Sequence, residues 1–493
     1  MNTTRVTSSV AMFATVAFPI LTQISCTSTQ ASDPIAERQR AVEEGLLPAV
    51  VVAGDSAPTY SIAARMEHYK VPGISVAVIN DGKVEWARGY GVKRVGSSDS
   101  VTASTRFQAA SISKPVAATA TLRLVEEGRL DLDGNVNDRL RSWRVPDNEF
   151  TAKQPVTLRE ILSHTAGLTV HGFPGYAAGD TVPSAVAVLD GKGNTDPVRV
   201  DTVPGALWRY SGGGYTVAQV LVGDVTGEPF ATVMKRLVLV PLGMKQSTYV
   251  QPLPARLADS AAVAYRSDGK PVEGRWHTYP EQAAAGLWTT PSDLGRFALG
   301  IRAAYLGEEG AILKQATARE MLTERMGGYG LGVGVEGAGD SLRFSHGGAN
   351  EGYRAFFVLH LATGDGVAVM TNSDAGAALY MEVVRAVAHV YGWPDFQPEM
   401  RTVVQVTPAA VEPYVGKYVL DQDFVISITQ QGGQLFAEYP GQPRARLLAE
   451  SETHFFPEGD QMRLTFARDA NGRVTHLVLH AGDRELEAKR RER

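Results

Sequence analysis

Ser111 and Lys114 stand three residues apart in the stretch "FQAASISKPV", residues 107–116. The residues that follow, through Glu127, predict a helix with Pro115 in its first turn, where a missing N–H costs little. Positions i and i+3 share one face of a helix, so the hydroxyl and the amine would lie together at the positive end of the helix dipole. Two interpretations stay open: a serine nucleophile with a lysine base, or a helix-capping serine beside a surface lysine.

The same spacing recurs at Ser267 and Lys270, within "YRSDGKPVEG". The Asp-Gly and Lys-Pro pairs of this stretch indicate an exposed turn, where the two side chains have no reason to converge. The spacing alone therefore does not single out Ser111, whereas its helical context does.

Tyr210 belongs to a second stretch, "PGALWRYSGGGYTVAQVLVGDVTG", residues 204–227. It precedes a glycine-rich turn, and the next helix is expected to begin near Tyr215. Tyrosine has a reference pKa of about 10 and is a poor base, yet beside a buried lysine it can share a proton and accept one from a serine. The alternative is a core tyrosine whose hydroxyl meets a backbone carbonyl.

A third stretch, "FSHGGANEGYRAFFVLH", holds His346, Gly347, Gly348 and Ala349. The two glycines would let a substrate backbone lie close against an edge strand, and the Ala349 N–H would face a developing oxyanion. His346 would donate a hydrogen bond to the substrate. A purely structural His-Gly-Gly turn is the alternative.

The composition limits what kind of protein presents these residues. A chain of 493 residues, 44% hydrophobic and 20% charged, predicts an ordinary globular protein of about two domains. With a net charge of −5, the chain lacks the excess of basic residues that is typical of a nucleic-acid-binding protein. The basic end "EAKRRER" is interpreted as a solvated tail.

The amino terminus indicates an export signal over residues 1–31. One arginine, an apolar stretch from Val10 to Leu21 and then small polar residues follow in the order of such a signal. The stretch is too short, and too interrupted by Pro19, for a permanent membrane span. Cleavage after Ala31 would give a periplasmic or secreted protein. Alternatively, Cys26, the single cysteine, is a lipid-attachment residue, and only then would the protein contact a membrane.

The remainder of the chain falls into two regions with different patterns of predicted secondary structure. Strand-like and helical segments alternate from about residue 59 to 395, which predicts a mixed α and β domain over 32–395. Beyond "GWPDFQPEM" come short alternating runs joined by turn signals such as Asn471-Gly472. Several short strands at regular spacing need closure to hide their edges, so residues 400–493 are expected to form a separate antiparallel β-barrel.

In this order and at these separations, the three stretches resemble the serine β-lactamase and penicillin-binding-protein superfamily. Its elements are S-x-x-K, Y-x-N and K-T-G or H-x-G, and the similar branch contains class C β-lactamases, D-aminopeptidases, esterases and "cubic" peptidases. Landmarks such as "VTLREILSHTAGL" and "AAGLWTTPSDLGRFAL" are similar too, over most of residues 59–380. The resemblance implies an α+β fold: an antiparallel sheet flanked by helices with an all-helical subdomain, followed here by a small lipocalin-like barrel.

The resemblance also implies an acyl-transfer hydrolase. Ser111 matches the acylated nucleophile, Lys114 the base that activates it, and Tyr210 the residue that shuttles protons. The backbone amides of Ser111 and Ala349 match the oxyanion hole. The remaining matches line the substrate cleft: Gly212, His346, Gly347 and Gly348. Neither a metal nor a cofactor is implied.

One further landmark, His164 in "SHTAGL", is expected to be structural, because it precedes Gly167 near a predicted helix end.

Two departures from the family pattern bear on the substrate. Gly212 replaces the asparagine of Y-x-N, and His346 replaces the lysine of K-T-G. A neutral histidine offers no permanent cation to a substrate carboxylate, which favours a D-aminopeptidase-like or esterase-like enzyme acting on a small molecule or short peptide. A class C-like β-lactamase or D,D-peptidase is the alternative enzyme. A non-catalytic protein that binds peptidoglycan fragments or drugs is the alternative class, and the barrel is a candidate for homo-oligomer formation.

Overall fold

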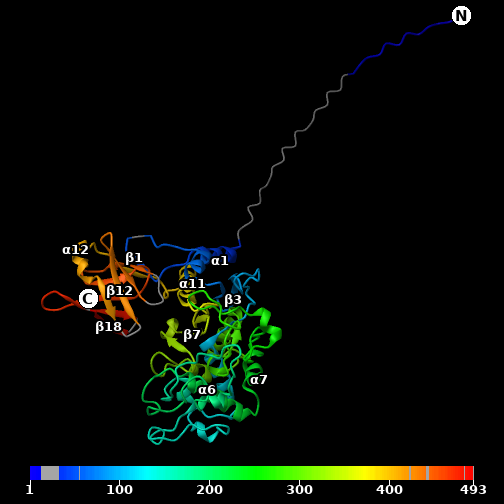
Figure 1. Cartoon of the computed structure of the whole chain (residues 1–493). Coiled ribbons are helices and arrows are strands. Elements are labelled where there is room, and N and C mark those ends of the chain that lie inside the picture. Colours follow the sequence, from blue (N-terminus) through cyan, green and yellow to red (C-terminus); the bar gives the residue numbers. More distant parts are fainter. Residues whose placement is uncertain (13–32, 55, 421–423, 440–443, 482–483, 492–493) are drawn as a thin grey trace.

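A computed structural model describes residues 1–12, 33–54, 56–420, 424–439, 444–481 and 484–491. The folded part forms two bodies, a larger one that carries helices and a sheet and a smaller one made of strands (Figure 1). The expected cleavage after Ala31 and the expected lipidation of Cys26 both lie outside the described residues. Within the described part, no helix has the length and apolar character needed to cross a bilayer.

The larger body is built on a six-stranded antiparallel sheet of strand order β3-β2-β9-β8-β7-β6. On one face, α11 packs on β8 and β9 and is itself covered by α1 and α2, while α9 packs on the opposite face. Strand β2 reads "GISVAVIN" and is buried almost throughout, since it has helices on both faces. The bounds are β2 (Gly73–Asn80), β3 (Lys83–Gly91), β6 (Gly334–Glu336), β7 (Arg343–Asn350), β8 (Tyr353–His360), β9 (Gly366–Thr371), α1 (Pro34–Glu44), α2 (Ile62–Tyr69), α9 (Pro291–Leu306) and α11 (Gly376–Tyr391).

A helical subdomain continues the apolar core on the side of the sheet where α9 lies. Its helices share one buried cluster with the residues of α9 and of the inner sheet face. They are α3 (Ser113–Glu126), α4 (Leu158–Leu162), α5 (Ala185–Leu189), α6 (Gly212–Thr226), α7 (Phe230–Met234), α8 (Gln282–Ala285) and α10 (Gln315–Met321). The α+β fold with an all-helical subdomain is confirmed.

The smaller body is a closed eight-stranded antiparallel barrel, as expected. Its strands are β11 (Gly416–Val419), β12 (Val425–Gln431), β13 (Gln434–Glu438), β14 (Ala445–Ala449), β15 (His454–Pro457), β16 (Arg463–Arg468), β17 (Val474–Ala481) and β18 (Arg484–Arg490). The interpretation of the basic end as a solvated tail is wrong up to Arg490. Strand β18 pairs with both β17 and β11, and it therefore closes the barrel.

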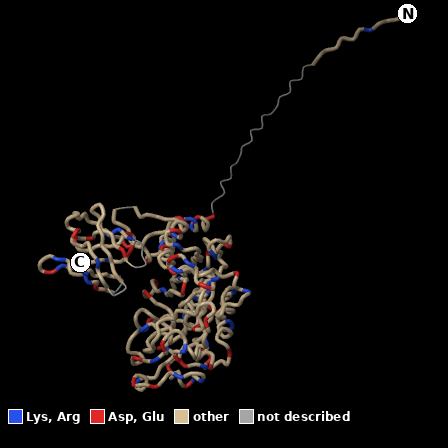
Figure 2. Tube along the Cα trace, in the orientation of Figure 1, with Lys and Arg blue, Asp and Glu red and all other residues tan. Residues whose placement is uncertain are grey.

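Two short strands join the bodies. Strand β1 (Val50–Val52) pairs in parallel with β10 (Glu399–Arg401), and Val50 packs with the barrel residues Leu448 and Phe456. The barrel lies near α1, whereas α6 lies at the far end of the larger body (Figure 1). Basic and acidic residues are interspersed over both bodies (Figure 2).

Candidate active site

Ser111 lies on a tight turn that is fixed on both sides. The turn, η1 (Ala110–Ile112), follows the short strand β4 (Phe107–Gln108), and Ala110 has a φ of 50°. The Ala109 N–H donates to the Leu287 carbonyl at 2.8 Å, and the Leu287 N–H donates to Ser113 Oγ at 2.9 Å. A non-glycine residue in the left-handed region is strained, and such strain collects at functional sites. The turn leaves Ser111 half-buried while its neighbours are buried.

The structure excludes one of the two interpretations of Ser111, that of a residue capping α3. The N-cap residue of α3 is Ile112, so Ser111 does not hold the capping position. Instead, Lys114 Nζ lies 3.0 Å from Ser111 Oγ and donates a second bond to the Ala284 carbonyl at 2.9 Å. The expected pairing of the hydroxyl with the amine is therefore present.

Lys114 is 2% exposed, and this burial lowers its pKa from 10.5 to about 7. Its Nζ lies 4.8 Å from the centre of the Tyr210 ring and 5.8 Å from that of Tyr215. A lysine with a pKa of about 7 is substantially neutral at physiological pH. It can then accept the proton of the Ser111 hydroxyl.

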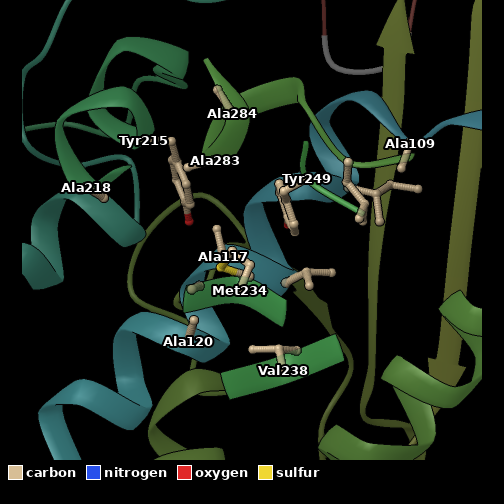
Figure 3. Packing of buried hydrophobic residues seen from close by; sticks show 14 of the residues in the cluster. Ala109, Ala117, Ala120, Tyr215, Ala218, Met234, Val238, Tyr249, Ala283 and Ala284 are labelled. Carbon is tan, nitrogen blue, oxygen red and sulfur yellow. The ribbon is translucent and has the colours of Figure 1, made fainter. Parts of the chain in front are cut away.

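Small side chains bring the helices around Lys114 close together. Ala117 on α3, Ala218 on α6, and Ala283 and Ala284 on α8 belong to one packed cluster (Figure 3). Because a methyl group takes little space, α8 approaches closely enough for a backbone carbonyl to reach the lysine amine. This carbonyl was not predicted from the sequence, because any residue type supplies one.

The Tyr210 side chain lies at the Ser111–Lys114 pair, with Lys114 Nζ 4.8 Å from the centre of its ring, and burial raises the pKa of Tyr210 above the ordinary value. Tyr210 is therefore a phenol at neutral pH, which suits it to relay a proton rather than to act as the resting base. The expectation that the next helix begins near Tyr215 is wrong, since α6 begins at Gly212. Ser211 caps it by accepting a bond from the Gly214 N–H at 2.9 Å, so the glycines form its first turn.

Gly212 borders the loop that carries Phe173. A Cβ atom at Gly212 would lie 3.0 Å from the His171 carbonyl oxygen and 3.0 Å from the Phe173 ring. The asparagine side chain that the family carries at this position would meet the Phe173 ring. The role of Gly212 in substrate binding stays a prediction.

His346 lies on β7 and is 8% exposed. Its Nδ1 lies 2.5 Å from the Gly347 carbonyl oxygen, which can only accept, so Nδ1 carries the proton. Burial and the nearby charge of Lys114 lower the pKa of His346 to about 3. The ring is thus neutral with its lone pair on Nε2, a buried atom without a hydrogen-bond partner among the described residues, so this tautomer does not fit the expected donor.

The edge of β7 runs beside the turn of Ser111. A two-residue turn joins Asn350 to Tyr353, which makes these two the last hydrogen-bonded pair of the hairpin. Backbone groups alternate along a strand, so the Ala349 N–H points away from β8. This geometry fits the expected oxyanion hole, in which the amides of Ser111 and Ala349 converge.

Gly348 permits this close approach, because a Cβ there would lie 2.2 Å from the Ala109 carbonyl oxygen. We expect Gly348→Ala to push the turn of Ser111 away from β7. The melting temperature should fall by several degrees, since overpacking costs about 1–3 kcal/mol, and activity should fall with it. Gly347→Ala is the matched control for stability, because a Cβ at Gly347 meets only a carbonyl oxygen at 4.0 Å. Equal melting temperatures for the two variants would contradict the proposed packing.

The second serine–lysine pair is not assembled in this way. Lys270 pairs with Asp268 at 2.9 Å and remains exposed, as expected for a turn. Within the described ranges, no cluster of three or more His, Cys, Asp or Glu side chains is arranged to hold a metal ion.

Comparison with known proteins agrees with the architecture. Residues 61–391, more than half of the chain, match the family described as Beta-lactamase. Residues 400–492 match the family described as Domain of unknown function (DUF3471).

Individual relatives match different shares of the chain. The chain is 23% identical to Penicillin-binding protein 4* of Bacillus subtilis, over 83% of this chain and 93% of that protein. It is 29% identical to Esterase EstB of Burkholderia gladioli, over 47% of this chain and 63% of that protein. Its fold matches the octameric penicillin-binding protein homologue from Pyrococcus abyssi with a TM-score of 0.60 and 21% identity, over 87% of this chain and 98% of that chain.

Proposed function

Since the chain belongs to the beta-lactamase family and is a serine hydrolase, we propose that it cleaves small esters or amides through an acyl-enzyme on Ser111. The observation that carries this proposal is the grouping of Ser111, Lys114 and Tyr210, in which Lys114 Nζ lies 3.0 Å from Ser111 Oγ and 4.8 Å from the centre of the Tyr210 ring. It combines a half-buried hydroxyl, an amine with a pKa of about 7 and a phenol. A binding protein has no need of such a proton relay, so this set speaks against a non-catalytic role.

In acylation, Ser111 Oγ forms a bond to the substrate carbonyl carbon, and its proton passes to neutral Lys114. The amides of Ser111 and Ala349 stabilise the resulting oxyanion. When the tetrahedral intermediate collapses, the bond to the leaving group breaks, and the proton returns from Lys114 through Tyr210 to that group. In deacylation, water attacks the ester carbon while the same groups accept its proton, and Ser111 Oγ leaves with a proton.

The substrate class follows from His346. A side chain with a pKa of about 3 carries no charge at pH 7, so the position gives a substrate carboxylate no cationic partner. We therefore infer an esterase-like or D-aminopeptidase-like substrate without a carboxylate near the scissile bond. A class C-like β-lactamase or a D,D-peptidase is the second candidate, in keeping with the similarity to a penicillin-binding protein.

Intact-mass detection of covalent adducts tests the proposal across β-lactams, p-nitrophenyl esters and D-amino-acid amides. We expect turnover of neutral esters or amides and slow or absent turnover of β-lactams. Efficient hydrolysis of β-lactams with inert esters would favour the second candidate. Binding of these compounds without any adduct or product would overturn the enzymatic proposal.

His346→Lys should shift this preference. The introduced ammonium is a charge-assisted partner for a carboxylate, worth about 1.5–3 kcal/mol if well placed, or roughly ten- to a hundredfold in relative rate. The ratio of kcat/KM for a β-lactam to that for a neutral p-nitrophenyl ester should rise by this factor at pH 7.5. An unchanged ratio would show that His346 lies away from the acyl donor.

We also propose that the chain is exported. The support is the order of an arginine, an apolar stretch and small polar residues within residues 1–31. Mass determination of the mature amino terminus separates cleavage after Ala31 from a lipidated Cys26. An uncleaved chain would contradict export through this signal.

A further inference from the structure

His164 lies two residues beyond the end of α4 and has a φ of 63°. We propose that His164 is the positioning residue of Tyr210, holding its hydroxyl against Ser111. The inference rests on the proposed function, in which Tyr210 relays protons. The structural role expected for His164 concerned only its backbone position at a helix end. The present inference concerns the contacts that its imidazole ring makes.

His164 binds the chain on both sides of Tyr210. The Arg209 N–H donates to the His164 carbonyl oxygen at 2.8 Å, and the Ser211 N–H donates to His164 Nδ1 at 3.1 Å. The ring itself lies against the Tyr210 ring, with centroids 4.2 Å apart and planes inclined by 33°. One residue thus fixes the backbone before and after Tyr210 and also the face of its ring.

The bond to Nδ1 determines the state of the imidazole. A backbone N–H can only donate, so Nδ1 carries a lone pair and the neutral ring has its proton on Nε2. His164 is 2% exposed, and burial lowers its pKa well below the ordinary value, which keeps Nδ1 available as an acceptor. A hydrocarbon or phenyl side chain of similar size would fill this space but would leave the Ser211 N–H without its partner.

His164 is itself held in place by other aromatic rings. The ring centroids of Tyr215 and Tyr329 lie 5.3 Å and 4.9 Å from its own. The Tyr215 hydroxyl donates to the Leu162 carbonyl oxygen at 2.9 Å, which ties α6 to the end of α4. His164 is therefore held by contacts with α4 and α6, and it in turn restrains Tyr210, which lies in a loop.

Rigidity matters here because Tyr210 is not in a helix or strand. A proton relay through Tyr210 requires its hydroxyl to reach hydrogen-bond distance of Ser111 while protons move, and a displacement of about 1 Å costs on the order of a hundredfold in rate. Loss of the Nδ1 acceptor should release the backbone at Ser211 and allow such a displacement.

The test is a double-mutant cycle between His164 and Tyr210 on a neutral p-nitrophenyl ester. His164→Phe keeps a ring but removes the acceptor, and we expect kcat to fall about 10- to 100-fold with KM changed less than about threefold. His164→Asn keeps an acceptor and should recover most of the lost kcat. In a Tyr210→Phe background, His164→Phe should cost less than about threefold, because the group that it positions is already absent.

Stability is followed by melting temperature in each variant, and His164→Leu enters the same cycle if His164→Phe does not fold. His360→Leu is the matched control, because His360 is also buried but bonds to Asp395 at 3.0 Å instead of contacting Tyr210. It should lower the melting temperature without lowering kcat.

A wild-type kcat in His164→Phe, or equal losses in the presence and absence of the Tyr210 hydroxyl, would overturn the inference. Retained turnover in Ser111→Ala would instead overturn the proposed function. The two failures are thus read from different variants.

Discussion

Replacing Ser111 with alanine should lower kcat/KM for a p-nitrophenyl ester by at least about a thousandfold and abolish covalent labelling. The substitution removes only the hydroxyl oxygen of a half-buried side chain. The backbone hydrogen bonds that hold the turn do not involve this hydroxyl. The variant should therefore fold normally and still bind substrate. Steady-state kinetics, intact mass after incubation with the ester, and melting temperature measure these three properties.

Ser267→Ala is the matched control, because Ser267 has the same spacing to a lysine but lies in an exposed turn. It should have wild-type kinetics and wild-type labelling. An adduct that persists in Ser111→Ala, or a rate that does not change, would remove Ser111 from the mechanism.

The sequence predicted the pairing of Ser111 with Lys114 because their relation is local. Three residues apart at a helix start, the Ser111 and Lys114 side chains share a face whatever the surrounding fold. The barrel strands were also readable, since alternating burial and Gly or Asn turns are local signals. The family resemblance then implied what spacing does not, a proton-relay role for Tyr210 about a hundred residues away in the chain.

What the sequence did not indicate depends on contacts between distant segments. The Ala284 group that binds Lys114 is a backbone carbonyl, which no residue type in the sequence reveals. The hydrogen bond from the Ser211 N–H to His164 joins two segments that are distant in the chain. The basic end from Glu487 onward is predicted to be a tail because charge indicates solvent, yet its residues up to Arg490 belong to β18. At a barrel strand only alternate residues face inward, and there Ala488 is buried between charged neighbours.

Lys114→Met should lower kcat/KM about a thousandfold or more, because methionine has no lone pair that can accept the serine proton. In the wild type, kcat/KM for an uncharged ester should rise with pH through about 7, as Lys114 loses its proton. The variant should lack this rise. Lys270→Met is the matched control and should keep the wild-type profile, since Lys270 is exposed. A wild-type pH profile in Lys114→Met would exclude Lys114 as the base.

The same residue links stability to pH. Its pKa is about 7 in the folded chain and 10.5 as a free side chain, so between these values the unfolded chain holds a proton that the folded chain has released. The free energy of unfolding of the wild type therefore rises with pH in this window, by up to about 1.4 kcal/mol per pH unit from this group.

Lys114→Met lacks this contribution to the free energy of unfolding. The free energy of unfolding of the wild type should therefore increase relative to that of the variant from pH 7 to 9, and the difference between the two should stay constant below pH 6. Urea denaturation at pH 5, 6, 7, 8 and 9 measures that difference, in which groups common to both proteins cancel. If the two stability curves run parallel across pH 7 to 9, Lys114 keeps an ordinary pKa in the folded protein and is not a neutral base at physiological pH.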